Sequence, residues 1–247
     1  LIRSVNLGTL NLARSIGIDP IIETAHRLGI WGERGTFKDP DSKVWFKRLG
    51  AEEEEGDGLV PLLPTAIGAS DVSLFELVNA YAVFQRGGIY MRPQMIMEIK
   101  DANGRVLYKA EQQTGKRVLS EETARKITIL MRAVTKVGTA KISMRNIEQQ
   151  VAVKTGTSNG PNDLSMIGFT PEFTIGIRFG YDQPKPIALP IYMKKRTGSS
   201  DKWVSAGWVI GEVFRRVVDR VYKNRPKVEF SPDIEMGTKD LLDNYQG

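Results

Sequence analysis

The chain of 247 residues contains no cysteine and only one histidine, His26. Without cysteine there are no disulfides, thiolate metal sites or cysteine nucleophiles, and one histidine cannot build a histidine-based zinc site. A Ser-His-Asp triad would depend on His26, which lies within an expected helix and is more typical of packing or surface. No apolar run approaches the roughly 18 residues that a membrane-spanning helix requires. These absences exclude thiol chemistry and zinc sites built from cysteine or histidine.

The composition is that of an ordinary globular protein, with 41% hydrophobic and 26% charged residues. The net charge of +6 raises the possibility of a nucleic-acid partner, but the basic residues are spread out. The densest basic groups, 194–196 and 215–216, are small and are not interleaved with aromatic residues, so we expect no nucleic-acid partner. No signal peptide is visible, and the chain begins at Leu1 in mid-pattern, so we expect it to be a piece of a longer protein.

Apolar spacing and capping signals predict helices separated by a hairpin and a sheet. Ser73 and Glu76 form a capping-box pattern, and Asn103-Gly104 between apolar runs predicts a hairpin. Residues 32–62, with the acidic run 52–55, are expected to be irregular, and 226–247 a polar tail or linker. Helices are expected over 3–16, from 19 to about 28, from 70–73 to the stop at 87–88, from 120 through 134 to a turn at 138–140, and over 203–222. Strands are expected over 151–157, around 164–169 and over 173–181.

Helices followed by three closely linked strands and a further helix indicate an α+β fold, with an antiparallel sheet flanked by helices. Trp208, Val209, Val213, Phe214 and Val217 are the expected buried stripe of the last helix.

Three short polar elements lie at the ends of these expected elements. They are Ser4-Val5-Asn6 at the head of the first helix, Lys154-Thr155-Gly156-Thr157 at a strand end, and Thr197-Gly198-Ser199 before the last helix. By itself Ser4 could be a helix cap, Asn6 a surface residue, and Lys154 an exposed strand end.

The wider context resembles the transpeptidase domain of class A penicillin-binding proteins, which cross-link peptidoglycan. The similarity is carried by Ser4-Val5-Asn6 with residues 12–19, by 66–73 with 79–82 and 87–88, and by 154–159 with 168–172 and 180–182. It covers about residues 2–220. It implies a penicillin-binding or serine β-lactamase-like fold, incomplete in this chain, with 1–225 as the C-terminal part of the transpeptidase domain.

The resemblance also implies roles for six residues. Ser4 would relay protons, Asn6 would hydrogen-bond the family's catalytic lysine and the substrate amide, and Lys154 would hold positive charge beside Ser4. Thr155 and Thr157 would offer hydroxyls to the substrate carboxylate, and the Thr157 N–H would be an oxyanion donor. Gly156 would leave room for a substrate lying along the strand. No metal or organic cofactor is implied.

In this family the nucleophile lies in a Ser-x-x-Lys motif that precedes Ser-x-Asn, and only Leu1-Ile2-Arg3 precedes Ser4 here. The Ser-x-x-Lys at 199–202 comes after Lys-Thr-Gly, which is the wrong order. We therefore expect the nucleophile on an upstream segment or a separate chain, and this chain alone to be inactive.

The expected activity is DD-transpeptidation of D-Ala-D-Ala stem peptides through a serine acyl-enzyme, inhibited by β-lactams. The alternatives are a non-catalytic cell-wall binding or scaffold protein, and a DD-carboxypeptidase or β-lactamase-like hydrolase. The resemblance implies a location outside the cytoplasm, at the periplasmic face of the inner membrane, with an upstream anchor and a glycosyltransferase domain in the parent protein.

Overall fold

The computed structural model describes residues 1–31, 36–38, 45–47, 59–183, 185–188 and 204–245. The acidic run 52–55 and the segments 194–196 and 197–202, singled out in the sequence, lie outside the described residues. The helices are α1 (Asn6–Ile16), α2 (Asp19–Arg27), the 3-10 helix η1 (Leu63–Ile67), α3 (Leu74–Gln85), α4 (Glu121–Lys136), α6 (Ala206–Val221) and α7 (Pro232–Asp243).

Among the described residues, every strand pair is antiparallel. The central sheet has the order β7-β8-β9, formed by Ala152–Thr157, Asp163–Phe169 and Thr174–Gly180. The smaller pairs are β1 (Thr36–Lys38) with β2 (Trp45–Lys47), β3 (Ile89–Tyr90) with β6 (Lys116–Arg117), and β4 (Glu98–Lys100) with β5 (Val106–Lys109). The expected α+β class with an antiparallel sheet is confirmed.

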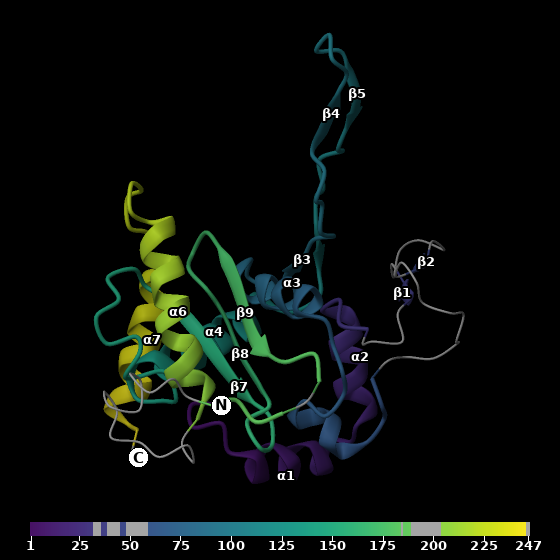
Figure 1. Cartoon of the computed structure of the whole chain (residues 1–247). Helices are drawn as coiled ribbons and strands as arrows, with labels where there is room; N and C mark the ends of the chain where they lie inside the picture. The colour runs from purple at the N-terminus through teal and green to yellow at the C-terminus, as the bar shows by residue number, and fades with distance from the viewer. Residues whose placement is uncertain (32–35, 39–44, 48–58, 184, 189–203, 246–247) are drawn as a thin grey trace.

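Helices cover both faces of the central sheet, as Figure 1 shows. Strand alternation directs Val153 to the face covered by α6, where it joins a core that contains Phe214. Ala152 points to the other face, where it packs with Met131 of α4 and with Phe169. Lys154 and Gly156 share the face of Ala152, and Thr155 and Thr157 share that of Val153. This alternation divides the candidate site residues between the two faces.

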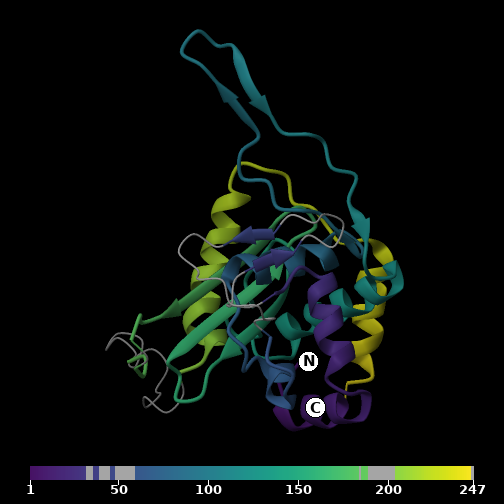
Figure 2. The ribbon, with the colours of Figure 1, turned by 90° about the vertical axis from the view of Figure 1, so that its right-hand side faces the viewer.

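Capping residues set the expected helix starts. Ser73 and Glu76 form a complete capping box at α3, and Ser120 accepts from the Thr123 N–H at α4. The hairpin around 101–104 is also confirmed, because the Asp101 N–H donates to the Arg105 carbonyl. It extends away from the body of the molecule in two views (Figures 1 and 2).

The C-terminal residues differ from the expected loose tail. They form α7, which packs on α4. Buried Arg132 of α4 donates from Nε and Nη2 to the Glu235 carboxylate, each at 2.8 Å, and its Nη1 donates to the Val151 carbonyl. Phe230 lies under the Arg132 guanidinium, 5.4 Å from its ring centroid. A partly buried ion pair, with Arg132 buried and Glu235 35% exposed, therefore holds a segment whose polar composition gave no sign of packing.

Two further details differ from the sequence expectations. The first helix begins at Asn6, not at residue 3. In α6 the buried stripe is Ala206, Ile210, Phe214 and Val218, and Val213 is 48% exposed. Among the described residues no helix is both long and apolar enough to cross a lipid bilayer.

Candidate active site at the edge of the central sheet

Strand β7 has one open edge among the described residues, because it pairs only with β8. The Ser158 N–H donates to the Asp163 carbonyl on the β8 side. Alternate residues of a strand direct their N–H and C=O groups to opposite sides, and the register from Ala152 to Thr157 is continuous. Thr155 and Thr157 therefore present their backbone groups to the open edge, where an extended peptide could add as a further strand.

Lys154 and Ser4, 150 residues apart in the sequence, meet beside this edge. The Lys154 ammonium donates to Ser4 Oγ at 2.8 Å and to the Thr155 carbonyl at 2.7 Å. An ammonium has three donors, so these two bonds account for two of them. The structure thus joins the two motifs that the sequence singled out.

Ser4 has an unusual backbone conformation. Its φ is +53°, and among the described residues it is the only non-glycine with a positive φ. Such a conformation costs about 1 kcal/mol or more and persists where surrounding contacts enforce it. The helix cap of α1 is Val5, so the Ser4 hydroxyl has no capping role and is directed to Lys154 instead.

Burial lowers the pKa of the Lys154 ammonium from its usual value, because desolvation disfavours the charged form. Lys154 can therefore release a proton more readily than an exposed lysine. A hydroxyl that accepts from such an ammonium can pass a proton along the pair.

The two threonines of the motif face α6, and each hydroxyl has a partner there. Thr155 is buried, and its Oγ1 lies 2.7 Å from Thr139 Oγ1. Thr157 Oγ1 accepts from the Ala206 N–H at 3.1 Å. Ser205 makes no side-chain cap, so Thr157 satisfies one of the free N–H groups of α6. The positive end of the α6 dipole thereby lies against the end of β7 and favours an anion there.

The other two predicted residues are less closely involved. Asn6 begins α1 and is exposed. A Cβ added at Gly156 would lie 2.5 Å from Ser165 Oγ on β8. That hydroxyl can rotate away, so the contact does not by itself require glycine. The structure brings Ser4, Lys154, Thr155 and Thr157 together and leaves Asn6 on the adjoining surface.

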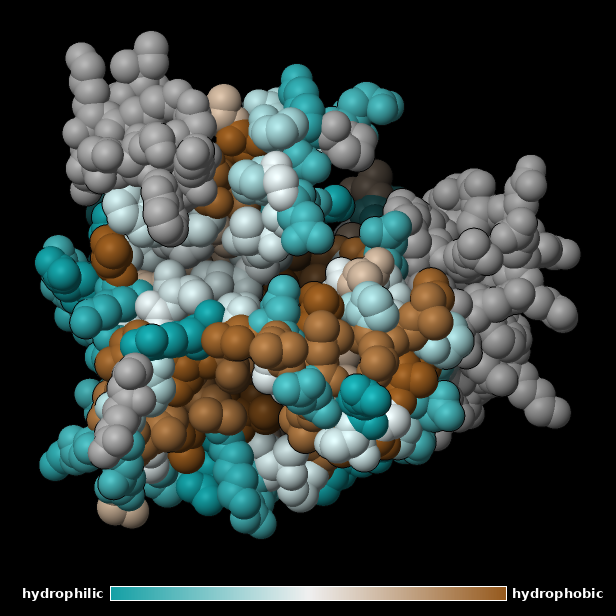
Figure 3. Space-filling model, turned by 90° about the horizontal axis from the view of Figure 1, so that it is seen from below, coloured by the Kyte–Doolittle hydropathy of each residue, from teal (hydrophilic) through white to brown (hydrophobic). Residues whose placement is uncertain are grey.

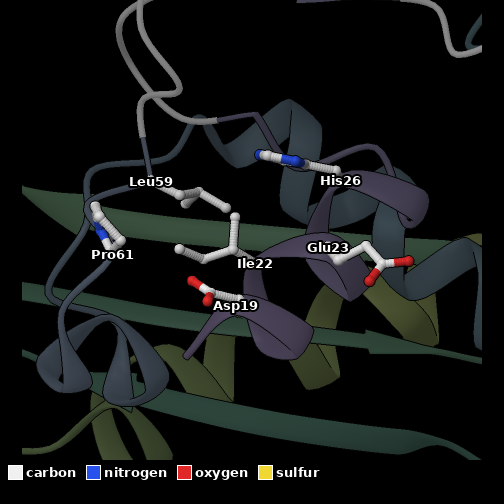
Figure 4. Close-up of a pocket in the computed structure, with 6 residues that line it drawn as sticks. All are labelled: Asp19, Ile22, Glu23, His26, Leu59 and Pro61. Carbon is white, nitrogen blue, oxygen red and sulfur yellow. The ribbon is translucent and has the colours of Figure 1, made fainter. Parts of the chain in front are cut away.

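A separate hollow of about 480 Å³ lies against α2 (Figure 4). Asp19, Ile22, Glu23 and His26 line it from the helix, and Leu59 and Pro61 face Ile22. None of these residues belongs to the group around Lys154. His26 stacks on Trp31 with ring centroids 4.4 Å apart, in agreement with its expected packing role.

A serine held by a lysine at the open edge of an antiparallel sheet, next to a helix N-terminus, is an arrangement suited to acyl transfer. Residues 1–173 match the family model described as the penicillin binding protein transpeptidase domain. The chain belongs to this family.

Relatives with similar sequences, and a solved structure with a similar fold, agree with this assignment. Penicillin-binding protein 1A of Rickettsia typhi is 28% identical over 94% of this chain and 27% of its own length, and that of Aquifex aeolicus is 26% identical over 98% and 28%. The crystal structure of penicillin-binding protein 1A from Haemophilus influenzae superimposes with a TM-score of 0.70 at 19% identity, over 94% of this chain and 35% of that one. The chain thus spans about a quarter of the length of the named relatives.

Sequence reasoning missed the residues that hold the site together. Thr139 lies in a short Gly-Thr-Ala stretch after α4 that matches none of the motifs singled out in the sequence, and the Arg132–Glu235 pair joins positions 103 residues apart. No local pattern marks such long-range partners.

Proposed function

We propose that this chain is the C-terminal part of a DD-transpeptidase domain that forms an acyl-enzyme with D-Ala-D-Ala stem peptides and with β-lactams. The observation that carries the proposal is the 2.8 Å bond from Lys154 Nζ to Ser4 Oγ beside the open edge of β7. The nucleophile would come from a Ser-x-x-Lys segment outside this chain.

In this reaction the nucleophilic serine attacks the carbonyl of the penultimate D-Ala. Its proton passes to the leaving amine through Ser4 Oγ, and the terminal D-Ala departs. An amine of a second stem peptide then attacks the ester, forms the cross-link and regenerates the serine. Lys154, with its lowered pKa, supplies a proton to Ser4 and its charge attracts the substrate carboxylate. The Thr157 N–H at the open edge would donate to the oxyanion.

The surface beside Ser4 is suited to receive the nucleophile segment, because it is apolar and exposed. Figure 3 shows hydrophobic residues gathered over this face, which carries α1 and η1. Val5 and Leu7 are 58% and 69% exposed, and Leu12 and Ile16 are 61% and 51% exposed. An exposed apolar patch of this kind marks a contact with further protein. The same proposal includes a glycosyltransferase domain, a membrane anchor and a position outside the cytoplasm, and these rest on the resemblance of the sequence to class A penicillin-binding proteins.

The experiment uses the full-length protein that contains this chain, with lipid-linked substrate, and measures cross-linked against merely trimmed product. We expect Ser4→Ala to reduce β-lactam acylation and cross-linking about a hundredfold, since a general acid–base group typically contributes that much. Ser15→Ala is the matched control, because Ser15 is an exposed serine of α1 whose hydroxyl donates to the Leu12 carbonyl. Trimmed product alone would indicate a carboxypeptidase, and no acylation at all would indicate a non-catalytic scaffold.

A further inference from the structure

The turn that follows α4 touches every element of the candidate site. Gly138 and Thr139 lie two and three residues beyond the end of α4 at Lys136. The Thr139 N–H donates to the Ile2 carbonyl at 3.3 Å, and its Oγ1 lies 2.7 Å from Thr155 Oγ1. Its carbonyl lies so close to α6 that a Cβ built on Gly207 would be 2.1 Å from the oxygen. One residue therefore contacts the segment before α1, strand β7 and helix α6.

The contact with Ile2 also fixes Ser4. Ile2 is buried, and a Cβ built on Gly138 would lie 2.4 Å from its carbonyl oxygen. The approach is between backbone atoms, so neither side can yield by a side-chain rotation. Ser4 follows two residues later, and its N–H donates to the Leu1 carbonyl at 3.2 Å. The turn after α4 thus holds the short segment in which Ser4 adopts its positive φ.

The contact of Thr139 with Thr155 determines which acceptor the Thr155 hydroxyl can donate to. A hydroxyl has one proton to donate and two lone pairs that accept. If Thr139 donates to Thr155 Oγ1, the Thr155 proton is free for an anion at the end of β7. The chain of two hydroxyls then strengthens, because each hydrogen bond polarises the next.

We propose that Thr139 is a positioning residue of this site. Its hydroxyl donates to Thr155 Oγ1 and so directs the Thr155 O–H to the substrate carboxylate, while its backbone N–H holds the Ser4 segment. This inference rests on the proposed function and adds a residue that acts only through Thr155 and Ile2.

The experiment measures the second-order rate of acylation of the full-length protein by benzylpenicillin and by its methyl ester, which lacks the carboxylate. Thr139→Val keeps the branched shape and the backbone N–H but removes the hydroxyl. We expect it to slow acylation by the acid about tenfold, the usual effect of one hydrogen bond, and to leave acylation by the ester nearly unchanged. Thr139→Ser restores the hydroxyl and the acid rate.

Thr128→Val is the matched control. Thr128 is a buried threonine of α4 whose hydroxyl donates to the Ala124 carbonyl. Its substitution removes a buried hydroxyl away from the site and should not change the ratio of the acid rate to the ester rate. Thr139→Val in a Thr155→Val background should likewise leave that ratio unchanged, since the carboxylate effect passes through Thr155.

Equal slowing of acid and ester by Thr139→Val would show a purely structural role and overturn the proposal. If Thr139→Val does not fold, the ratio of the acid rate to the ester rate is measured for Thr139→Ala. Selective slowing of the acid would then support the proposal, and equal slowing of both would overturn it. If the wild type is acylated and the variant has the same ratio of acid rate to ester rate as the wild type, this inference alone is refuted. Failure of the wild type to be acylated refutes the proposed function as well.

Discussion

Lys154 and Ser4 share a hydrogen bond, but they belong to regions that are packed in opposite ways. Around Lys154 the strand neighbours Val151, Ala152 and Val153 are fully buried between α6 and α4. Around Ser4 most of the large apolar side chains of α1 and η1 are exposed, although Ala13 of α1 is buried. The exposed apolar residues of α1 and its neighbours are Leu1, Val5, Leu7, Leu12, Ile16, Val60, Leu62, Leu63 and Ile67.

This difference in packing predicts which region is stable in the chain alone and which region needs a further protein segment to cover it. Burial of apolar surface contributes about 25 cal/mol per Å², so the region around β7 has its own stabilising core. The face formed by α1 and η1 contributes little hydrophobic stabilisation while its apolar side chains are exposed to water. We therefore expect the chain to be stable around the sheet and to acquire a function only when the α1 face is covered.

The largest expected effect is in the core that covers β7. Phe214 of α6 is fully buried beside Val153 and Met166. Phe214→Ala should lower the free energy of unfolding by about 4 kcal/mol, because it removes a large apolar group and leaves a cavity. Urea unfolding followed by circular dichroism measures this change. A loss below about 1 kcal/mol would contradict the account of a packed sheet region.

The next effect is at the contact of α7 with α4. Glu235→Gln leaves the buried Arg132 guanidinium without its anion and should lower the free energy of unfolding by about 2 kcal/mol, less than for a fully buried pair because the Glu235 side chain is 35% exposed. Glu148→Gln is the control, since its ion pair with Lys227 is exposed on both sides and should contribute much less to stability. Equal effects of the two substitutions would mean that α7 is only loosely attached.

Alkaline pH tests the packing of α3. Burial raises the pKa of Tyr81 to about 12, because the folded state disfavours the phenolate. The unfolded chain ionises near pH 10, so this tyrosine's contribution is complete below pH 10 and is lost as pH rises toward 12. At pH 11 the wild type should lose about 1 kcal/mol more than Tyr81→Phe, relative to pH 8.

Urea unfolding at the two pH values measures this difference. The control is the comparison of the wild type with Tyr81→Phe at pH 8, where the Tyr81 hydroxyl is neutral in both the folded and the unfolded state. If the free energy of unfolding of Tyr81→Phe and of the wild type changes equally with pH, the Tyr81 hydroxyl is not buried enough to raise its pKa.

The smallest effect is expected on the α1 face. Leu12 is 61% exposed, and Leu12→Gln keeps a good helix former. In this chain the substitution should change the free energy of unfolding by no more than about 0.5 kcal/mol. In the full-length protein it should lower the acylation rate, since there the nucleophile segment would cover the position. A large loss of stability in the chain alone would show that the Leu12 side chain already packs against another part of this chain.

Local sequence signals predicted much of the fold. Ser73 and Ser120 mark helix starts by their own hydrogen bonds, and the Asn103-Gly104 turn marks its hairpin, because these features depend on neighbours within four residues. The register that buries Phe214 but exposes Val213 depends on how α6 meets the sheet, so spacing alone misplaced Val213.

In the candidate site, too, some residues could be predicted from local motifs and others depend on partners that are distant in the sequence. Ser4 and Lys154 were identified by motif and resemblance, and the structure brings their side chains together. The orientation of Thr155 and Thr157 toward α6 follows from strand alternation and from Thr139 and Ala206, which are distant in the sequence. Arg132 and Glu235 could not be paired from the sequence, because an ion pair between helices that are far apart in the chain has no local signature.

The central claim is that this chain holds an acyl-transfer site that lacks its nucleophile. The most direct measurement is covalent labelling by a fluorescent penicillin, quantified by intact mass, for the chain alone and for the full-length protein. The account predicts no labelling of the 247-residue chain and stoichiometric labelling of the full-length protein at a Ser-x-x-Lys serine outside this chain. Stoichiometric labelling of the chain alone, at Ser199 or any other of its serines, would contradict it.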